Sequence, residues 1–157
     1  MHREDEDAKV MAAIESSMVT IRRRQTRRAL SREADNGVDP ALFDVVDAVE
    51  GAELQGRPVT VTDVAAALDV AQPRASKLVA AAVEAGLVRR EADQSDGRRA
   101  LLVRTEAGRE LCERVHRARR ARFARATAGW TARERATFAQ LLGRFVDGLT
   151  DPAAERH

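Results

Sequence analysis

Three side chains near the start of a predicted helix could hydrogen-bond to the edges of DNA bases: Gln72, Arg74 and Lys77. Glutamine matches the donor and acceptor pair of adenine, and arginine or lysine matches the two acceptors of guanine. In a helix-turn-helix, the N-terminal residues of the second helix reach these edges in the major groove. The first amide groups of such a helix also favour a phosphate. The predicted DNA-binding residues of this helix are Gln72, Pro73, Arg74, Ser76 and Lys77.

A second group of charged residues lies in a turn-rich loop and includes Asp96, Arg98 and Arg99. An arginine at the tip of a hairpin can enter the minor groove, whose negative potential attracts it. Asp96 precedes Arg98 by two residues and could hold its side chain through a charge-assisted hydrogen bond. We predict that Arg98 and Arg99 bind DNA and that Asp96 positions the wing. The alternative is an ion pair that serves only the hairpin turn.

The segments around these residues predict two helices followed by a hairpin. Residues 63–68 read as a short helix, and residues 72–85 read as a longer one with apolar residues at helical spacing. Residues 87–92 and 99–104 read as strands, and the turn-forming residues 93–98 join them. A helix pair joined by a short turn and followed by a hairpin is the arrangement of a winged helix-turn-helix.

Local signals also mark where these elements begin and end. Asp39 is a plausible N-cap for a helix that ends near residue 51, and Thr60 or Thr62 is a plausible N-cap for the short helix. The β-branched residues 59–61 could form a small strand. Gly86 is expected in the left-handed conformation that commonly follows a helix.

Amphipathic helices flank this module. One apolar stripe runs along residues 8–34, and a cleaner one runs along the last helix, which begins with a capping box at residues 131–134. Another helix follows the wing and runs to about residue 128. These apolar faces exceed what is needed to cover so small a module, so we expect a dimer interface. Its predicted residues are Met11, Ile14, Met18, Leu141, Phe145 and Leu149.

The predicted fold is mostly α-helical with a small β wing, in the order α-α-(β)-α-α-β-β-α-α. We expect a single domain over residues 1–157, a length that can bury its own core. Within it, residues 38–108 would form the winged helix-turn-helix DNA-binding lobe. Residues 8–36 and 109–150 would form the helical dimerisation region.

The composition disfavours one binding mode and leaves another open. Aromatic residues make up only 3% of the chain, which argues against nucleic-acid binding by base stacking. The net charge is +2, but residues 38–71 carry seven acidic residues and one basic residue, whereas residues 72–104 carry seven basic and four acidic ones. This change of sign could place a basic face beside an acidic body, or it could reflect ordinary solvated helix faces.

Other features of the sequence limit the compartment and the chemistry. The single cysteine, Cys112, allows no internal disulfide and no cysteine-based metal cluster, and it fits a reducing cytosol. The first residues lack the apolar stretch of a signal peptide, and no run reaches the length of a membrane span. There is no phosphate-binding glycine loop, nucleophile elbow or HExxH motif. We expect a cytoplasmic protein that is not an enzyme, has no cofactor or metal and does not bind a membrane.

At three linked segments the sequence resembles the MarR family of bacterial regulators. They are residues 71–79 in the helix-turn-helix, residues 84–90 at the helix end and first wing strand, and residues 96–99 together with 105–108 at the wing and the next helix. Arg104 departs from the family, which more often has a leucine before the threonine. This departure concerns the inward packing of the second wing strand.

The resemblance implies a homodimer whose first and last two helices intertwine and which binds a pseudo-palindromic operator in double-stranded DNA. It implies a repressor that releases DNA when a small aromatic or anionic effector enters a cleft beside the DNA-binding lobe. Transferred to this sequence, Arg98 is the minor-groove arginine and Asp96 is its partner. Arg74, Ser76 and Lys77 are the groove-facing residues of the recognition helix.

Two alternatives to this DNA-binding regulator stay open. One is a redox-sensing regulator that acts through Cys112, and the other is a winged-helix protein-interaction module that does not bind DNA. The arginine-rich run between Arg22 and Arg32 could line an effector pocket, contact phosphates or form a solvated face. A solvated face is the simplest interpretation of that run.

Overall fold

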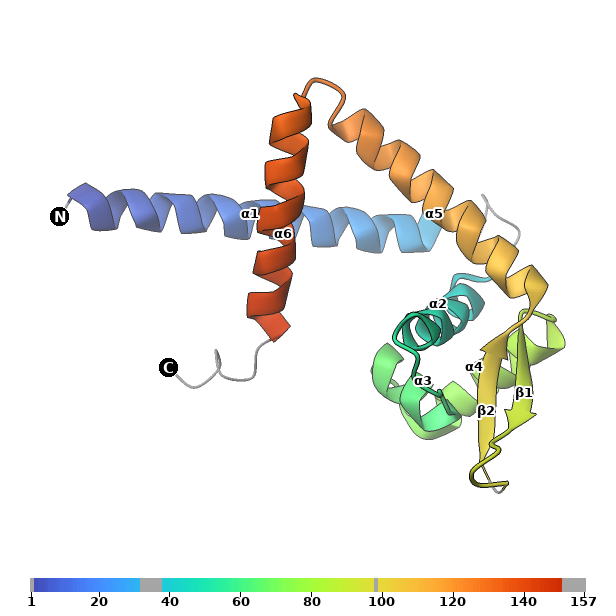
Figure 1. Ribbon diagram of the computed structural model, residues 1–157. Helices are drawn as coiled ribbons and strands as arrows, with labels where there is room; N and C mark the ends of the chain where they lie inside the picture. Colours follow the sequence, from blue (N-terminus) through green and yellow to red (C-terminus); the bar gives the residue numbers. More distant parts are fainter. Residues whose placement is uncertain (1, 32–37, 98, 151–157) are drawn as a thin grey trace. The chain divides into compact units, whose positions relative to one another are not determined.

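The protein is mostly helical, with a two-stranded antiparallel sheet, in a computed structural model that describes residues 2–31, 38–97 and 99–150 (Figure 1). The fold class predicted from the sequence is confirmed. In chain order the elements are α1 (His2–Ser31), α2 (Pro40–Leu54), α3 (Val61–Leu68), α4 (Gln72–Glu84), β1 (Val88–Ala92), β2 (Ala100–Arg104), α5 (Glu106–Ala126) and α6 (Ala132–Thr150).

The chain divides into two compact units, residues 1–112 and 113–157. The division falls within α5. The winged helix-turn-helix lies in the first unit and α6 lies in the second. The division into a DNA-binding lobe and a dimerisation region stays a prediction.

Helix α1 begins at His2, earlier than the predicted start at residue 8. Acidic residues at its start explain the difference, because negative charge near a helix N-terminus is stabilising. Asp5 also pairs with Lys9 one turn later, with 3.1 Å between the carboxylate and the ammonium group. The other predicted helix and strand boundaries differ from the observed ones by a few residues.

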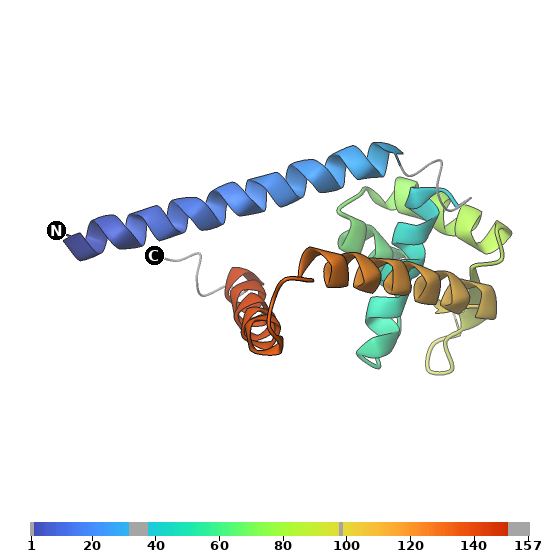
Figure 2. The same ribbon diagram turned by 90° about the horizontal axis from the view of Figure 1, so that it is seen from above.

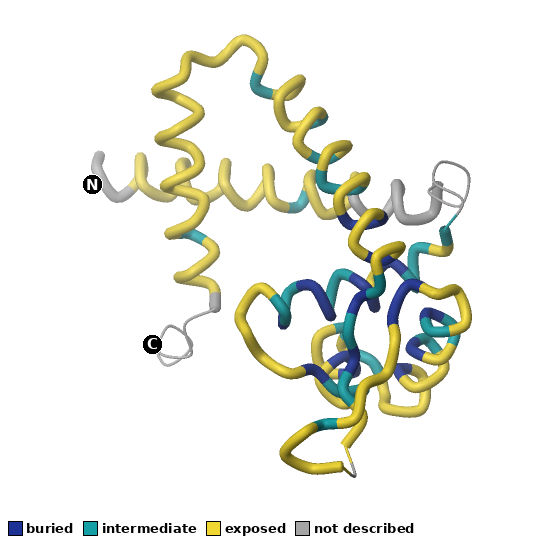
Figure 3. The backbone as a smooth tube through the Cα atoms, turned by 45° about the vertical axis from the view of Figure 1, so that its right-hand side comes forward, coloured by how far each residue is buried: buried dark blue, intermediate teal, exposed yellow. Residues whose placement is uncertain are grey.

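The core of the first unit lies among α2, α3, α4 and the hairpin, where the buried residues gather (Figure 3). Small and β-branched side chains fill most of it, together with the aromatic ring of Phe43, so the helices can approach closely. Its largest fully buried side chains are Leu111, Val45, Val46, Val49, Val64, Val79, Val88 and Cys112.

Side-chain caps fix the starts of the helices that surround this core. Asp39 accepts a hydrogen bond from the amide of Ala41 at 2.8 Å, so the predicted cap of α2 is confirmed. Thr60, one of the two candidates, caps α3. Its amide donates to Asp63 Oδ2 at 2.7 Å, and its hydroxyl accepts from the Asp63 amide at 3.4 Å. This capping box starts α3 at Val61, two residues before the predicted start.

The wing is an antiparallel hairpin whose register pairs Val88 with Arg104 and Ala92 with Ala100. It runs from the α4–β1 turn, next to the start of α5, out to its loop (Figures 1 and 2). The strand suggested for residues 59–61 is wrong, because Val61 already belongs to α3. Val59 nevertheless makes a strand-like hydrogen bond with β2, because the amide of Leu102 donates to the carbonyl of Val59 at 2.8 Å. Strand β2 is thus held on both edges.

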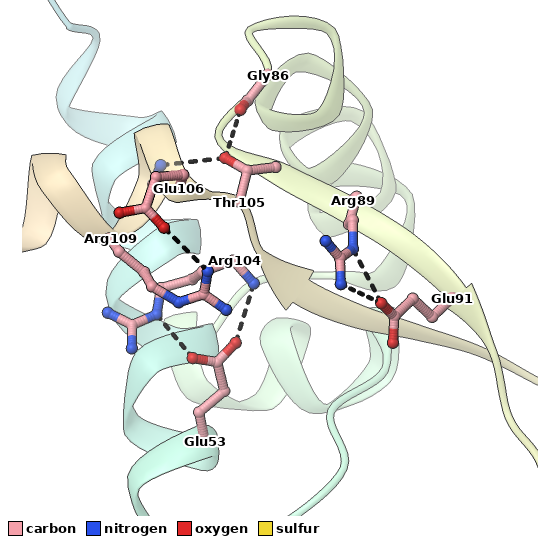
Figure 4. Close-up of polar contacts among 9 residues, drawn as sticks. Glu53, Gly86, Arg89, Glu91, Arg104, Thr105, Glu106 and Arg109 are labelled. Atoms are coloured by element: carbon pink, nitrogen blue, oxygen red, sulfur yellow. Dashed lines mark hydrogen bonds and ion pairs between the residues drawn. The ribbon is translucent and has the colours of Figure 1, made fainter.

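The start of α5 is fixed to the turn that ends α4. Gly86 adopts φ +70, the left-handed conformation expected for it, and its carbonyl accepts a 2.6 Å hydrogen bond from the Thr105 hydroxyl (Figure 4). The amide of Thr105 donates to the carbonyl of Leu87 at 3.1 Å. Gly108 lies so close that an added Cβ would be 2.1 Å from that carbonyl oxygen. Only glycine fits this approach without displacing the backbone.

Helices α1 and α6 are exposed over nearly all of their described length (Figure 3), and the exposed apolar side chains at helical spacing form one stripe on each helix. On α1, Met11 is 59% exposed and Met18 is 37% exposed. On α6, Leu141 is 52% exposed and Leu149 is 66% exposed. The capping box predicted at the start of α6 is confirmed, because the Thr131 amide donates to Glu134 Oε2 at 2.7 Å. Both helices are therefore amphipathic, and the side chains of their apolar stripes are exposed to solvent.

Candidate nucleic-acid interface

The predicted base-reading side chains lie on the outward face of the first two turns of α4. Each of the five is exposed, whereas Ala75 and Val79 of the same helix are fully buried. Burial of these small residues presses one face of α4 against the core, so the polar positions between them face solvent. The exposed residues are Gln72, Pro73, Arg74, Ser76 and Lys77.

The N-terminus of α4 is itself left open. Its N-cap residue, Ala71, has no side chain that can accept a hydrogen bond, and the amides of Arg74 and Ala75 bond to the carbonyl of Ala71. Pro73 has no amide hydrogen, and its fixed φ suits a first helical turn. The first turn of α4 therefore has no acidic cap that would repel a phosphate.

The side chain of Gln72 is held by a residue of the preceding helix. Its Nε2 donates to the hydroxyl oxygen of Thr62 at 3.1 Å. One amide hydrogen is used in this way, and the second hydrogen and the carbonyl oxygen stay available, which is the pair that adenine requires. Thr62 was considered from the sequence only as a helix cap. Its position two turns before the helix-turn-helix bend was the available signal for this second role.

The loop of the wing is organised by Asp93. Its carboxylate accepts hydrogen bonds from the amide of Ser95 at 2.9 Å and from the Ser95 hydroxyl at 2.7 Å. These bonds, with a smaller contribution from the charge of Arg99, lower the pKa of Asp93. The amide of Arg99 donates to the carbonyl of Asp96 at 2.9 Å, which closes the loop. Sequence reasoning missed Asp93, although an aspartate two residues before a serine is typical of such turns.

Two of the predicted wing residues, Asp96 and Arg99, are exposed at the loop. The third, Arg98, lies outside the described residues, so its pairing with Asp96 stays a prediction. The positive charge of Arg99 also acts on Asp63 at the start of α3. Hydrogen bonds from Thr60 chiefly lower the pKa of Asp63, and the charge of Arg99 adds to that effect.

The acidic segment that precedes α4, residues 38–71, contributes less free negative charge to the surface than its composition suggests. Asp39 and Asp63 cap helices, and Glu50 and Glu53 bind the guanidinium of Arg104. Carboxylates that are capped or paired in this way repel a polyanion less than free ones do. Four of the seven acidic residues in residues 38–71 are therefore engaged in helix caps or ion pairs.

Arg104, the residue that departs from the expected leucine, is 9% exposed. The inward packing of β2 is therefore kept, and polar contacts replace apolar ones. Beside it, Cys112 is fully buried in the first turns of α5. Burial raises the pKa of the Cys112 thiol, and the hydrogen bond with Arg104 offsets only part of that shift.

No group of three or more histidine, cysteine or acidic residues within residues 2–31, 38–97 and 99–150 could hold a metal ion. Over the same residues, no helix has the length and hydropathy to cross a membrane.

Comparison with known proteins connects this geometry to a family. Residues 36–99, which include the helix-turn-helix and the wing loop, match the model of the MarR family. No curated protein matches the chain. The fold is similar to that of a MarR family protein from Bacillus stearothermophilus, with 19% identity and a TM-score of 0.76 over 91% of this chain and 97% of that chain.

Two further structures come from S. aureus. A mutant of MepR bound to an oligodeoxyribonucleotide has 18% identity and a TM-score of 0.59, with 87% of this chain and 97% of that chain covered. MepR bound to ethidium bromide has 17% identity and a TM-score of 0.60, with 87% of this chain and 96% of that chain covered. At these identities the likeness concerns the fold.

Proposed function

Because residues 36–99 match the model of the MarR family and the chain is similar in fold to a MarR family protein, we propose that this protein is a transcriptional regulator that binds double-stranded DNA sequence-specifically. The observation that supports this most directly is the outward face of α4. Its five polar or conformationally restricted residues are exposed on a helix whose opposite face is buried. A helix presented in this way can enter the major groove with its N-terminal residues toward the bases.

The wing supplies the second contact. Arg98 enters the minor groove, Asp96 orients it, and Arg99 contacts the adjacent backbone. Within the described part of the loop, hydrogen bonds of Asp93 and Arg99 hold the turn that presents these side chains. The MepR structure with an oligodeoxyribonucleotide is a fold relative in complex with DNA, which supports DNA binding by a protein of this fold.

The regulator acts as a homodimer on a pseudo-palindromic operator. The stripes on α1 and α6 expose large apolar side chains, which is costly for a helix that stays in water. A second copy would cover them and place two recognition helices about one duplex turn apart. The proposed interface residues are Met11, Ile14, Met18, Leu141, Phe145 and Leu149, of which Phe145 is half-buried in the single chain.

We further propose that the protein represses transcription and that a small aromatic or anionic effector releases it from DNA. The support is the match of residues 36–99 to the MarR family model, together with a fold relative that binds the aromatic ligand ethidium bromide. The redox alternative is disfavoured, because Cys112 is fully buried and its raised pKa keeps the thiol protonated.

Binding to DNA from the region upstream of its own gene tests the proposal directly. The affinity should fall on the order of a thousandfold between about 50 and 200 mM salt, as expected for about six phosphate contacts. An unrelated duplex of the same length should bind more weakly at every salt concentration. Equal affinity for both duplexes, or no binding at the lower salt concentration, would support the protein-interaction module instead.

Replacing Arg98 with alanine should weaken operator binding by about 1–3 kcal/mol, because one groove contact is lost from each subunit. The dimer should persist, since the wing lies outside the proposed interface. Fluorescence anisotropy with a labelled operator measures the loss, and sedimentation checks the assembly. Arg133→Ala removes the same charge from α6 and should leave the affinity unchanged. An Arg98→Ala protein with parental affinity would show that the wing does not reach the groove.

A further inference from the structure

A cluster of charged residues lies inside the DNA-binding lobe, where β2 ends. Arg104 is the last residue of β2, and Glu50 and Glu53 lie one turn apart on α2. The whole residues Arg104 and Glu50 are each only 9% exposed, and the Glu53 side chain is 25% exposed. Such burial is unusual for arginine and glutamate unless the charges are paired.

Glu53 binds both the side chain and the backbone of Arg104 (Figure 4). Its Oε2 accepts from the guanidinium Nε at 2.8 Å, and its Oε1 accepts from the backbone amide of Arg104 at 2.9 Å. Glu50 accepts from another guanidinium nitrogen of Arg104. Because a main-chain atom of β2 is bound, the cluster fixes the strand itself as well as a side chain.

Arg104 has neighbours on three elements: β1, α5 and α2. Arg104 is paired with Val88 of β1 at the end of the hairpin nearest α5. Its guanidinium also contacts the buried thiol of Cys112 on α5. Burial alone would lower the pKa of Arg104, but the bonds to Cys112 and Glu53 and the charges of Glu53 and Glu50 raise it, so the guanidinium stays charged. Helices α2 and α5 are thereby linked through one end of the wing.

A buried charged cluster is a poor source of stability, because the cost of removing charges from water offsets most of their attraction. It is directional, however, since a planar guanidinium and two carboxylates satisfy one another in few geometries. Apolar side chains would fill the same space without fixing an orientation. The cluster therefore restricts the angle of the hairpin more effectively than it stabilises the fold.

We propose that Arg104, Glu50 and Glu53 are the positioning residues of the wing, which fix the hairpin against α2 so that its loop meets the minor groove. The effect on DNA affinity rests on the proposed DNA binding, whereas the effect on the hairpin does not. No DNA contact is assigned to these three residues. Their role is to hold β2 in one orientation relative to the recognition helix.

A triple variant separates position from stability: Glu50→Leu, Glu53→Met and Arg104→Leu together. Its urea midpoint should stay close to that of the parent, because buried ion clusters are often replaced by apolar residues without loss of stability. Amide hydrogen exchange of residues 88–92 and 100–104 should become about tenfold faster as the hairpin loosens. Operator affinity should fall about tenfold, the size of one lost groove contact.

The matched control is Glu91→Gln, which removes an exposed ion pair from the same hairpin. Arg89 Nε donates to Glu91 Oε1 at 2.9 Å, with both side chains about half exposed. An exposed pair contributes little, so exchange and affinity should change by less than about twofold. Arg104→Lys is a second test that keeps the charge but not the planar fork, so it should fold and show faster exchange of residues 88–92 and 100–104.

The outcomes are distinguishable. Parental exchange rates in both the triple variant and Arg104→Lys would overturn the positioning role. A triple variant that loosens the hairpin yet binds the operator with parental affinity would also overturn it. If the parent protein fails to bind DNA, the proposed function fails, and the exchange measurements still decide whether the cluster fixes the hairpin.

Discussion

Replacing Gly108 with alanine should lower the free energy of unfolding by about 3 kcal/mol, the upper end of the usual cost of overpacking. The added Cβ would lie 2.1 Å from the carbonyl oxygen of Leu87 and 3.2 Å from its carbon. Both are backbone atoms, so no side chain can rotate to make room. The start of α5 must then move away from the α4–β1 turn, which weakens the hydrogen bonds of Thr105 as well. Urea denaturation measures the change.

Gly51→Ala is the matched control for this substitution. Gly51 lies within α2, and a Cβ there would meet no atom within 4 Å. Alanine is favoured over glycine inside a helix by about 0.5–1 kcal/mol, so this variant should be slightly more stable than the parent. If Gly108→Ala also proves as stable as the parent, α5 does not rest on the turn as closely as described.

Two negative charges in the apolar stripe of α6 should abolish the dimer and reduce operator affinity by a factor of about 100 or more. The variant is Leu141→Glu with Leu149→Glu. Both side chains are exposed in the single chain, so the substitutions should leave the fold of the monomer intact. In the proposed dimer they become buried and unpaired, which is strongly unfavourable. Sedimentation at several concentrations gives the assembly, and anisotropy gives the affinity.

Gln140→Glu tests whether charge alone accounts for the effect. At 100° per residue, position 140 lies on the opposite side of α6 from the stripe, so an added carboxylate there should stay in water. This control should remain dimeric and bind the operator with parental affinity. A double-charge variant that still sediments as a dimer would place the interface elsewhere.

The fold and the family resemblance could be predicted because their signals are local in the sequence. Helical spacing of apolar residues, Asp39 as a cap, Gly86 as a left-handed turn and Thr131 with Glu134 as a capping box each depend on a few neighbouring residues. All of these predictions are confirmed. The match of residues 36–99 to the MarR family agrees with the motifs that suggested the resemblance.

The contacts that could not be predicted join residues far apart in the chain. Arg104 meets Glu53 across 51 positions, and nothing local to either residue indicates the other. Residues 59–61 have strand-like composition, but the capping box of Thr60 favours a helix start at Val61. Gln72 was predicted from its type and place, whereas its support from Thr62 depends on how two helices cross.

The burial of Cys112 has a practical consequence for spectroscopy. It is the single cysteine of the sequence, and its fully buried thiol should react slowly with maleimide reagents. A cysteine introduced at an exposed position, such as Gln94 in the wing loop, would then take a fluorophore selectively. The surroundings of the wing loop, with and without bound DNA, could then be followed in solution while the native thiol stays in place.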